Sequence, residues 1–286
     1  MITSTDSLSH TRWNHIPESK EPIHQIWELC QSKQADAPGE SDKVAELYKL
    51  IDQFHPDLQQ RGPDGLTAYE HAVQRDSGRM LYLVAYHGGL PLSGDDQLSQ
   101  LRHHTYFGKH LETILKVLDL PWILQNASQA AHEFEYITQY LLEKGQPELA
   151  DKILQSLLEY QKTGFHQCSD HLFDRALEKA ATGGHEASVN YLCRYAPNIT
   201  GSGVAEAFKT VIDQSFPGCV TPLMLLARCK PEAAQIIEMA ENLATERLAY
   251  KRRVNTMEPT VASFDHRDYD VTGAKLVKDQ ISALKI

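Results

Sequence analysis

Residues 64–89 read DGLTAYEHAVQRDSGRMLYLVAYHGG, and this stretch decides the expected fold. The turn signal Asp64-Gly65 opens it, two helical runs follow, and Gly88 lies just after the second run. Parts of the same pattern recur at residues 179–198, KAATGGHEASVNYLCRYAPN, and at residues 220–240, VTPLMLLARCKPEAAQIIEMA. A short pattern that recurs along a chain indicates a stack of similar structural units.

The first stretch resembles the ankyrin repeat, whose template reads D-G-x-T-P-L-H-x-A-A, an amphipathic helix, and L-L-x-x-G-A. Its spacing follows the template throughout. The second stretch keeps the A-A-x-x-G-H core of the template as Ala180, Ala181, Gly184 and His185. One complete and one partial copy make a binding solenoid the leading hypothesis for this chain.

The third stretch is the least regular copy. It keeps Thr221, Pro222 and Leu223, whereas Met224 replaces the template His and Lys230 replaces the template Gly. Its second helix is shifted by one residue against the template. We therefore expect a degenerate repeat at this end of the array.

The resemblance implies structural roles for several residues. In the first copy, the Thr67 hydroxyl would cap the inner helix, Ala72 with Val73 would let two helices approach closely, and Gly88 would permit a left-handed turn. In the second copy, the His185 imidazole would bond backbone between adjacent repeats. These roles position helices, and none of them is catalytic.

The spacing between copies predicts an irregular array. A fainter unit at residues 137–160 contributes Gly145, which lies 39 positions before Gly184. Against a period of about 33 residues, this spacing implies an insertion of about six residues near QKTGFHQCSD, residues 161–170. Residues 90–135 fit either a degenerate repeat or an inserted helical hairpin. This irregular style resembles the ankyrin-containing effectors that intracellular bacteria inject into host cells.

Strand signals are almost absent, so we expect an all-α fold. Its predicted form is an ankyrin-type helical-hairpin solenoid with degenerate repeats and extra terminal helices. We divide the chain into a polar N-terminal segment at 1–22, the solenoid at 23–253, and a C-terminal extension with a short amphipathic helix at 254–286. Periodicity predicts a first helix near 23–33 and a helix of about twenty residues after Pro231.

Composition excludes several classes of function. The chain has 286 residues and a formal net charge of -10, which argues against general nucleic-acid binding because phosphate contacts need clustered Lys and Arg. The only basic run, Arg247–Arg253, is expected to be a solvated helix end, with a lipid-binding or nucleic-acid-binding adaptor as the alternative. No apolar run is long enough for a membrane span or a signal peptide.

The five cysteines are scattered without C-x-x-C pairing, which is typical of reduced thiols. We therefore expect a cytoplasmic protein, or one that is delivered into a host cytoplasm if it is a bacterial effector. We expect a monomer or a weak dimer formed through an open end of the stack. The resemblance brings no cofactor.

Only one cluster suggests chemistry, at His166, Cys168, Asp170 and His171. A zinc site would need a second paired set of ligands, and the sequence offers none. A thiol nucleophile at Cys168 would need a nearby base, which a distant His could supply. The rival hypothesis is thus a Cys/His-dependent enzyme that acts on a protein substrate, carried on the helical scaffold.

Other polar pairs are expected to be structural or solvated. His103 and His110 are placed seven residues apart on one face of a predicted helix, too far apart for one metal ion. Asp95 and Asp96 are placed in a Gly- and Ser-rich loop, where hydration explains them. Cys219 is placed in the loop before Thr221. We therefore expect no metal and no catalytic residue.

The favoured function is non-catalytic binding of another protein through a concave surface of hairpin tips and inner helices. In the first copy, five positions are expected to be exposed and to contact the partner: Pro63, Asp64, Leu66, Gln74 and Arg75. In the third copy, five positions match them: Pro217, Gly218, Val220, Arg228 and Cys229.

Overall fold

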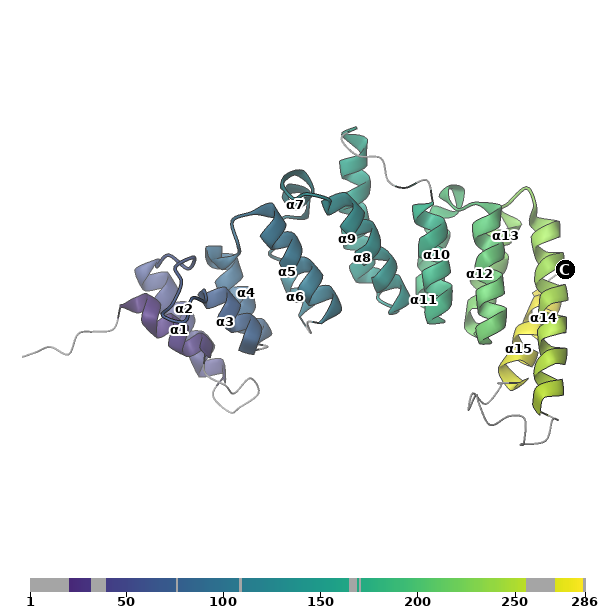
Figure 1. The fold of residues 1–286 in the computed structure, drawn as a ribbon, viewed down its shortest axis with the longest axis horizontal. Helices are drawn as coiled ribbons and strands as arrows, with labels where there is room; N and C mark the ends of the chain where they lie inside the picture. The colour runs from purple at the N-terminus through teal and green to yellow at the C-terminus, as the bar shows by residue number, and fades with distance from the viewer. Residues whose placement is uncertain are drawn as a thin grey trace, which may run out of the picture. The chain divides into compact units, whose positions relative to one another are not determined.

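The structure, a computed structural model, describes residues 21–31, 40–75, 77–107, 110–164, 169, 171–255 and 271–284. Within these residues every regular element is a helix, so the predicted all-α class is confirmed. The chain divides into two compact units, with unit 1 at residues 1–92 and 107–118 and unit 2 at residues 93–106 and 119–286 (Figure 1). None of the described helices has the length and apolar character that a membrane span requires.

Unit 1 contains two helical hairpins and a short helix. The first hairpin joins α1 (Pro22–Gln31) and α2 (Glu40–Phe54), and the second joins α3 (Ala68–Arg75) and α4 (Gly78–Val84), with a π-helical turn at Ala85–Gly89. α1 packs on α3, α2 packs on α4, and α6 (Leu111–Ile114) also packs on α4. Buried side chains from four helices form the core of the unit: Ile26, Leu47, Tyr69, Met80 and Leu81.

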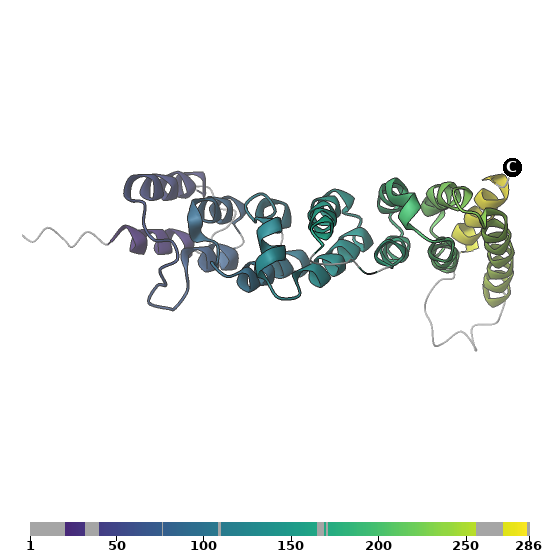
Figure 2. The same ribbon diagram turned by 90° about the horizontal axis from the view of Figure 1, so that it is seen from above.

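Unit 2 contains five hairpins whose helices form two layers (Figure 2). Layer A consists of α5 (Gly94–Tyr106), α8 (Ala130–Glu143), α10 (Leu172–Gly183), α12 (Gly201–Gln214) and α14 (Ala233–Asn255). Layer B consists of α7 (Leu120–Asn126), α9 (Pro147–Lys162), α11 (Glu186–Leu192), α13 (Val220–Arg228) and α15 (Val271–Leu284). Each helix packs against the next helix of its own layer, so every hairpin stabilises its neighbours.

Short 3₁₀ segments at Cys193–Asn198 and Pro217–Cys219 connect helices of unit 2. The expected long helix is confirmed by the 23 residues of α14. The C-terminal helix α15 docks back onto α13 and α14. Residues 90–135 are divided between the units, because α5 and α7 form a hairpin of unit 2 while α6 belongs to unit 1.

A left-handed residue ends three of the layer A helices. These residues are Gly145 after α8, Gly184 after α10 and Ser215 after α12, with φ of 71°, 69° and 63°. Two of these turns are covered by the ring of the next hairpin. A Cβ at Gly145 would lie 2.7 Å from the His185 ring, and a Cβ at Gly184 would lie 2.8 Å from the Phe216 ring.

At Ser215, a lysine takes the place of such a ring. The Nζ of Lys251, on α14, donates to the Ser215 hydroxyl and to the Asp213 carbonyl, the latter at 3.3 Å. Lys251 is buried, and these two acceptors take two of the three hydrogen bonds that its ammonium group can donate. Contacts at the turns therefore link four successive hairpins of unit 2.

Carboxylates at the opposite ends of the layer A helices also join successive hairpins. Asp95 accepts hydrogen bonds from the Ser128 backbone N–H at 2.7 Å and from its hydroxyl at 2.8 Å. Glu135 accepts from the Ser169 N–H at 2.8 Å. Asp95 and Asp96 lie in the first turn of α5, so placing them in a hydrated loop was wrong.

The carboxylate of Asp174, on α10, repeats this arrangement at the next junction. It accepts from the Thr200 N–H at 2.8 Å and from the Thr200 hydroxyl at 2.7 Å. Thr200 in turn caps α12, because its hydroxyl accepts from the Gly203 N–H at 3.0 Å. Each carboxylate thus fixes the start of the next hairpin.

Candidate partner-binding surface

The loop at residues 62–67 contains the beginning of the complete signature and lies between α2 and α3. The Gly62 N–H donates to the Leu66 carbonyl at 2.8 Å, and the Gly65 N–H donates to the Gly62 carbonyl at 2.9 Å. Asp64 Oδ1 accepts from the Leu66 N–H at 3.1 Å. These bonds fold the loop into a tight turn, as the sequence predicts.

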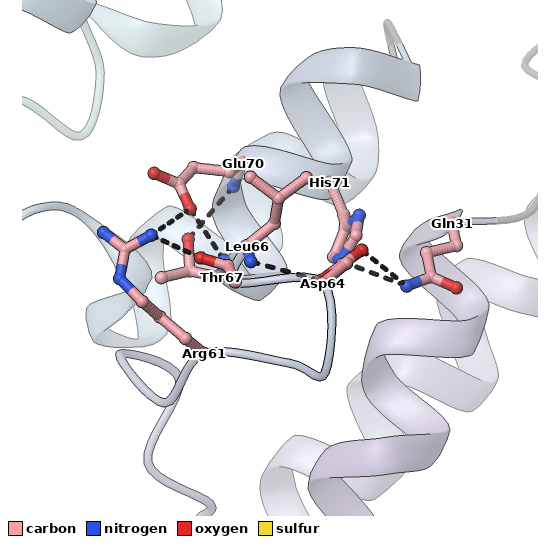
Figure 3. A network of polar contacts seen from close by, with 8 residues as sticks. Gln31, Arg61, Asp64, Leu66, Thr67, Glu70 and His71 are labelled. Carbon is pink, nitrogen blue, oxygen red and sulfur yellow. Dashed lines mark hydrogen bonds and ion pairs between the residues drawn. The ribbon is translucent and has the colours of Figure 1, made fainter.

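A reciprocal capping box anchors the loop to α3. The Thr67 hydroxyl accepts from the Glu70 N–H at 3.2 Å, and Glu70 Oε2 accepts from the Thr67 N–H at 2.7 Å (Figure 3). Arg61 Nη1 donates to the Gly65 carbonyl at 2.6 Å and lies 3.2 Å from Glu70 Oε2. The predicted capping role of Thr67 is therefore present in the structure.

A second polar contact ties the same loop to α1. Asp64 Oδ2 lies 3.2 Å from Nε2 of the buried His71 (Figure 3). The Gln31 amide nitrogen lies 3.3 Å from Asp64 Oδ2 and 3.2 Å from His71 Nε2. Both oxygens of Asp64 are thus used to hold the loop, although its side chain is 44% exposed.

The five predicted residues of the first copy differ in exposure. Pro63, Asp64 and Gln74 are exposed, and Leu66 is half-buried. Arg75 is 8% exposed, so the expectation that it is a surface residue was wrong. Its Nη1 donates to the Leu29 carbonyl at 2.6 Å and to Met80 Sδ at 2.9 Å, which directs the guanidinium into the unit between α1 and α4.

The second set lies around α13 in unit 2. Gly218, Arg228 and Cys229 are exposed and Pro217 is half-buried. Val220 is fully buried, so its expected exposure was wrong. Each set is contained in its own unit.

Two residues of this set already have partners within the chain. The Arg228 guanidinium donates to the Leu284 carbonyl of α15. The Cys229 thiol donates to the Leu225 carbonyl at 3.3 Å. They therefore contribute to the docking of α15 and to the end of α13.

The third copy is out of phase with the second. The resemblance makes the helix that begins near Thr221 an inner helix, equivalent to α10, yet α13 packs in layer B with α11 and α15. The helix that follows, α14, packs in layer A against α12. Residues 217–229 therefore do not occupy the positions that residues 63–75 occupy in the first copy.

The glycine turns agree with the sequence. Gly88 has φ of 96°, the left-handed conformation that the resemblance implies, and Gly184 has φ of 69° and is also left-handed. Ala72 is fully buried and Val73 is half-buried in α3. The His185 ring lies against Gly145 of the preceding hairpin, but among the described residues the expected hydrogen bond from its imidazole to backbone is not found.

The cluster proposed for chemistry lies mostly outside the described residues, since His166, Cys168 and Asp170 are not among them. His171 is exposed, and its Nδ1 lies 3.8 Å from Asp174 Oδ2. His103 lies in α5 of unit 2 and His110 precedes α6 of unit 1, so placing them on one helix was wrong. Over the described ranges, no group of three or more His, Cys, Asp or Glu is arranged to hold a metal ion.

The buried cysteines are poor nucleophiles. Burial raises the pKa of Cys30 to about 12 and that of Cys219 to about 11. Cys219 is fully buried in the 3₁₀ segment. Burial also raises the pKa of Cys193, whose thiol donates to the Val189 carbonyl at 3.5 Å. Raised pKa values keep these thiols protonated at neutral pH.

Sequence reasoning missed a groove between α12 and α14, which is lined along α14 by Ile236, Met239 and Leu243. These residues follow each other at three- and four-residue steps, the spacing of one helix face. This spacing of apolar residues can be seen in the sequence. From the sequence, this run served only to predict the length of the helix after Pro231.

The chain matches no family model, and comparisons with curated proteins and with solved structures give no match either.

Proposed function

We propose that this chain is a non-catalytic protein-binding module of the ankyrin type. The exposed tip of the 62–67 loop and the neighbouring surface of α3 around Gln74 would contact the partner. The single observation that carries the proposal is the rigid support of this loop. Binding surfaces gain affinity when they are ordered before the partner arrives, because less conformational entropy is lost on binding.

The support comes from both sides of the loop. The Thr67–Glu70 capping box and Arg61 hold it to α3, and the Asp64–His71–Gln31 contacts hold it to α1. The polar side chains of this loop are occupied by these intramolecular contacts, so they are not available to a partner. The tip keeps Pro63 and Gly65 exposed, so backbone shape and the nearby Gln74 form the contact surface.

Photo-crosslinking tests this proposal. A photoreactive amino acid at Gln74 is compared with the same amino acid at Gln53, an exposed glutamine of α2 in the same unit. We expect a discrete protein adduct from position 74 in the lysate of expressing cells, and none from position 53. Competition with the unmodified chain should abolish the adduct. Equal adducts from both positions, or none from position 74, would contradict the proposed surface.

The irregular spacing that resembles injected bacterial effectors favours a host protein as the partner. The rival proposal of a Cys/His enzyme depends on Cys168, which lies outside the described residues. Our proposal for the function is therefore binding.

A further inference from the structure

A groove runs between α12 and α14 in unit 2. It consists of two adjoining hollows of about 570 Å³ and 480 Å³ that share Gln235 and Met239 as lining residues. Because both hollows are bordered by the same two helices, they form one continuous groove. It follows α14 from Glu232 to Glu246, a length of about 21 Å at 1.5 Å per helical residue.

The floor of the groove is apolar. Ile236, Met239 and Leu243 line it from α14, and Ala205 lines it from α12. Met239 and Leu243 are half-buried, whereas Ala240 on the adjacent face of α14 is fully buried in the unit. The three α14 side chains thus form an apolar ridge along one face of the helix, at the bottom of the groove and next to the core. The methionine and leucine side chains are flexible and can adapt to a partner.

The rim of the groove is acidic. Glu232, Glu238 and Glu246 line it, and their carboxylates form no hydrogen bond or ion pair with other described residues. Two cations on the helices that border the groove are each paired with a carboxylate. Lys209 Nζ lies 2.5 Å from Glu206 Oε1, and Arg247 Nε lies 2.7 Å from Asp213 Oδ1.

We propose that this groove binds a cationic amphipathic helix of a partner protein. The apolar ridge would receive the apolar face of the helix, and the three unpaired glutamates would pair with lysines or arginines that flank that face. The length of the groove corresponds to about four helical turns. This inference rests on the proposed function in making the ligand a protein, and it names a second surface and the chemistry of the segment bound there.

The test uses the full chain and a fluorescent 18-residue peptide of leucine and lysine at helical spacing. Fluorescence anisotropy at physiological salt gives the affinity. The Glu238→Lys/Glu246→Lys variant is compared with Glu159→Lys/Glu178→Lys, which changes the net charge equally at exposed sites on α9 and α10. We expect at least about a tenfold loss of affinity in the groove variant and less than about twofold in the control.

A second variant tests the apolar floor. Leu243→Ser keeps every charge and is expected to weaken peptide binding about threefold or more. Circular dichroism checks that each variant is folded. Absence of peptide binding by the wild-type chain, or an equal loss in the groove and control variants, would overturn the proposal.

Other outcomes separate this proposal from the one above. Self-association of the chain that the groove variant abolishes would show that a second copy occupies the groove, which also overturns the proposal. A cross-link from position 74 without peptide binding would contradict the proposed role of the groove and would leave the proposed function intact. Peptide binding without that cross-link would support the groove and contradict the loop surface.

Discussion

Gly88 of unit 1 and Gly184 of unit 2 share a left-handed backbone but differ in their surroundings. A Cβ at Gly88 would meet no heavy atom within 4 Å, whereas a Cβ at Gly184 would lie 2.8 Å from the Phe216 ring. The Gly88 carbonyl accepts from the Gln59 side-chain amide at 2.6 Å, but no described group packs over the Cα of Gly88 as the Phe216 ring packs over Gly184. The turn at Gly184 is also a packing site for the next hairpin, so the same residue type has a local role in one unit and a connecting role in the other.

Replacement of Gly184 by alanine should have the largest effect on stability. We expect Gly184→Ala to lower the free energy of unfolding by about 3 kcal/mol, through left-handed strain and a clash with the Phe216 ring. We expect Gly88→Ala to cost about 1 kcal/mol, from strain alone. Urea unfolding followed by circular dichroism measures both changes.

Hydrogen exchange locates the effect of each substitution. Faster exchange should spread from α10 into α12 in Gly184→Ala and should remain within the α3–α4 hairpin in Gly88→Ala. A second substitution, Phe216→Ala, should cost less in the Gly184→Ala background than in the wild type, because removal of the ring there also relieves the clash with the new Cβ. Equal costs for the two glycine substitutions would contradict the connecting role of Gly184.

The carboxylates give a second, smaller contrast between the units. Asp174 bonds to the next hairpin through the Thr200 N–H and hydroxyl, whereas Glu70 bonds to the start of its own helix at Thr67. We expect Asp174→Ala to cost about 2 kcal/mol and Glu70→Ala about 1 kcal/mol, again by urea unfolding. A larger loss in Glu70→Ala would show that the loop of unit 1, rather than the stack of unit 2, depends more on its carboxylate.

Alkaline pH gives the smallest contrast. The pKa of Cys30 in unit 1 is raised to about 12 and that of Cys219 in unit 2 to about 11, both by burial. In the unfolded chain the thiols have a pKa of about 8.5, so above that pH they lose their protons in the unfolded chain but keep them in the folded one. The contribution of thiol burial to the free energy of unfolding is therefore fully present below about pH 8.5 and falls as pH rises towards the folded pKa values. The loss at pH 9.5 should be about 1.4 kcal/mol per thiol.

Alanine variants isolate each thiol. Cys30→Ala and Cys219→Ala should each reduce the slope of unfolding free energy between pH 8 and pH 9.5 by a similar amount. The two slopes should separate only above pH 11, where Cys219 titrates in the folded chain and Cys30 does not. An unchanged slope in either variant would show that the corresponding thiol ionises as readily in the folded chain as in the unfolded one.

Local features of the fold could be predicted from the sequence. The Thr67 cap, the turns at Gly88 and Gly184 and the length of α14 all depend on residues within about one helical turn, and the structure contains each of them. The all-helical class follows from the same short-range signals. Periodicity was therefore a reliable guide to these elements, although it placed Asp95 in a loop and His103 and His110 on one helix.

Distant contacts could not be predicted. Arg75 has the pattern of a solvated helix end, but its acceptor is the Leu29 carbonyl, 46 positions earlier in the chain. Asp95 has the pattern of a loop residue, but it bonds to Ser128, 33 positions later. Which layer a helix joins is likewise decided by its neighbours, and this is why α13 was assigned the wrong phase.

The candidate surface was predicted in part for the same reason. Tip residues such as Pro63 and Gln74 are exposed because their own turn and helix face direct them outward. The burial of Val220 and the groove beside Met239 both require knowledge of how adjacent helices stack. A template gives the positions of repeats but not the junction between two particular repeats.

The rings at the turns bear on how the number of hairpins in this protein could change by duplication. The His185 ring already packs over a left-handed glycine, Gly145. If residues 172–199 were duplicated in tandem, His185 of the second copy would pack over Gly184 of the first copy. Gly184 of the second copy would then contact Phe216, as Gly184 does now. An insertion after α13 would instead separate Ser215 from the Lys251 ammonium. A duplication in the interior would therefore keep the ring contacts at the turns, whereas one before α14 would break the Lys251 contact.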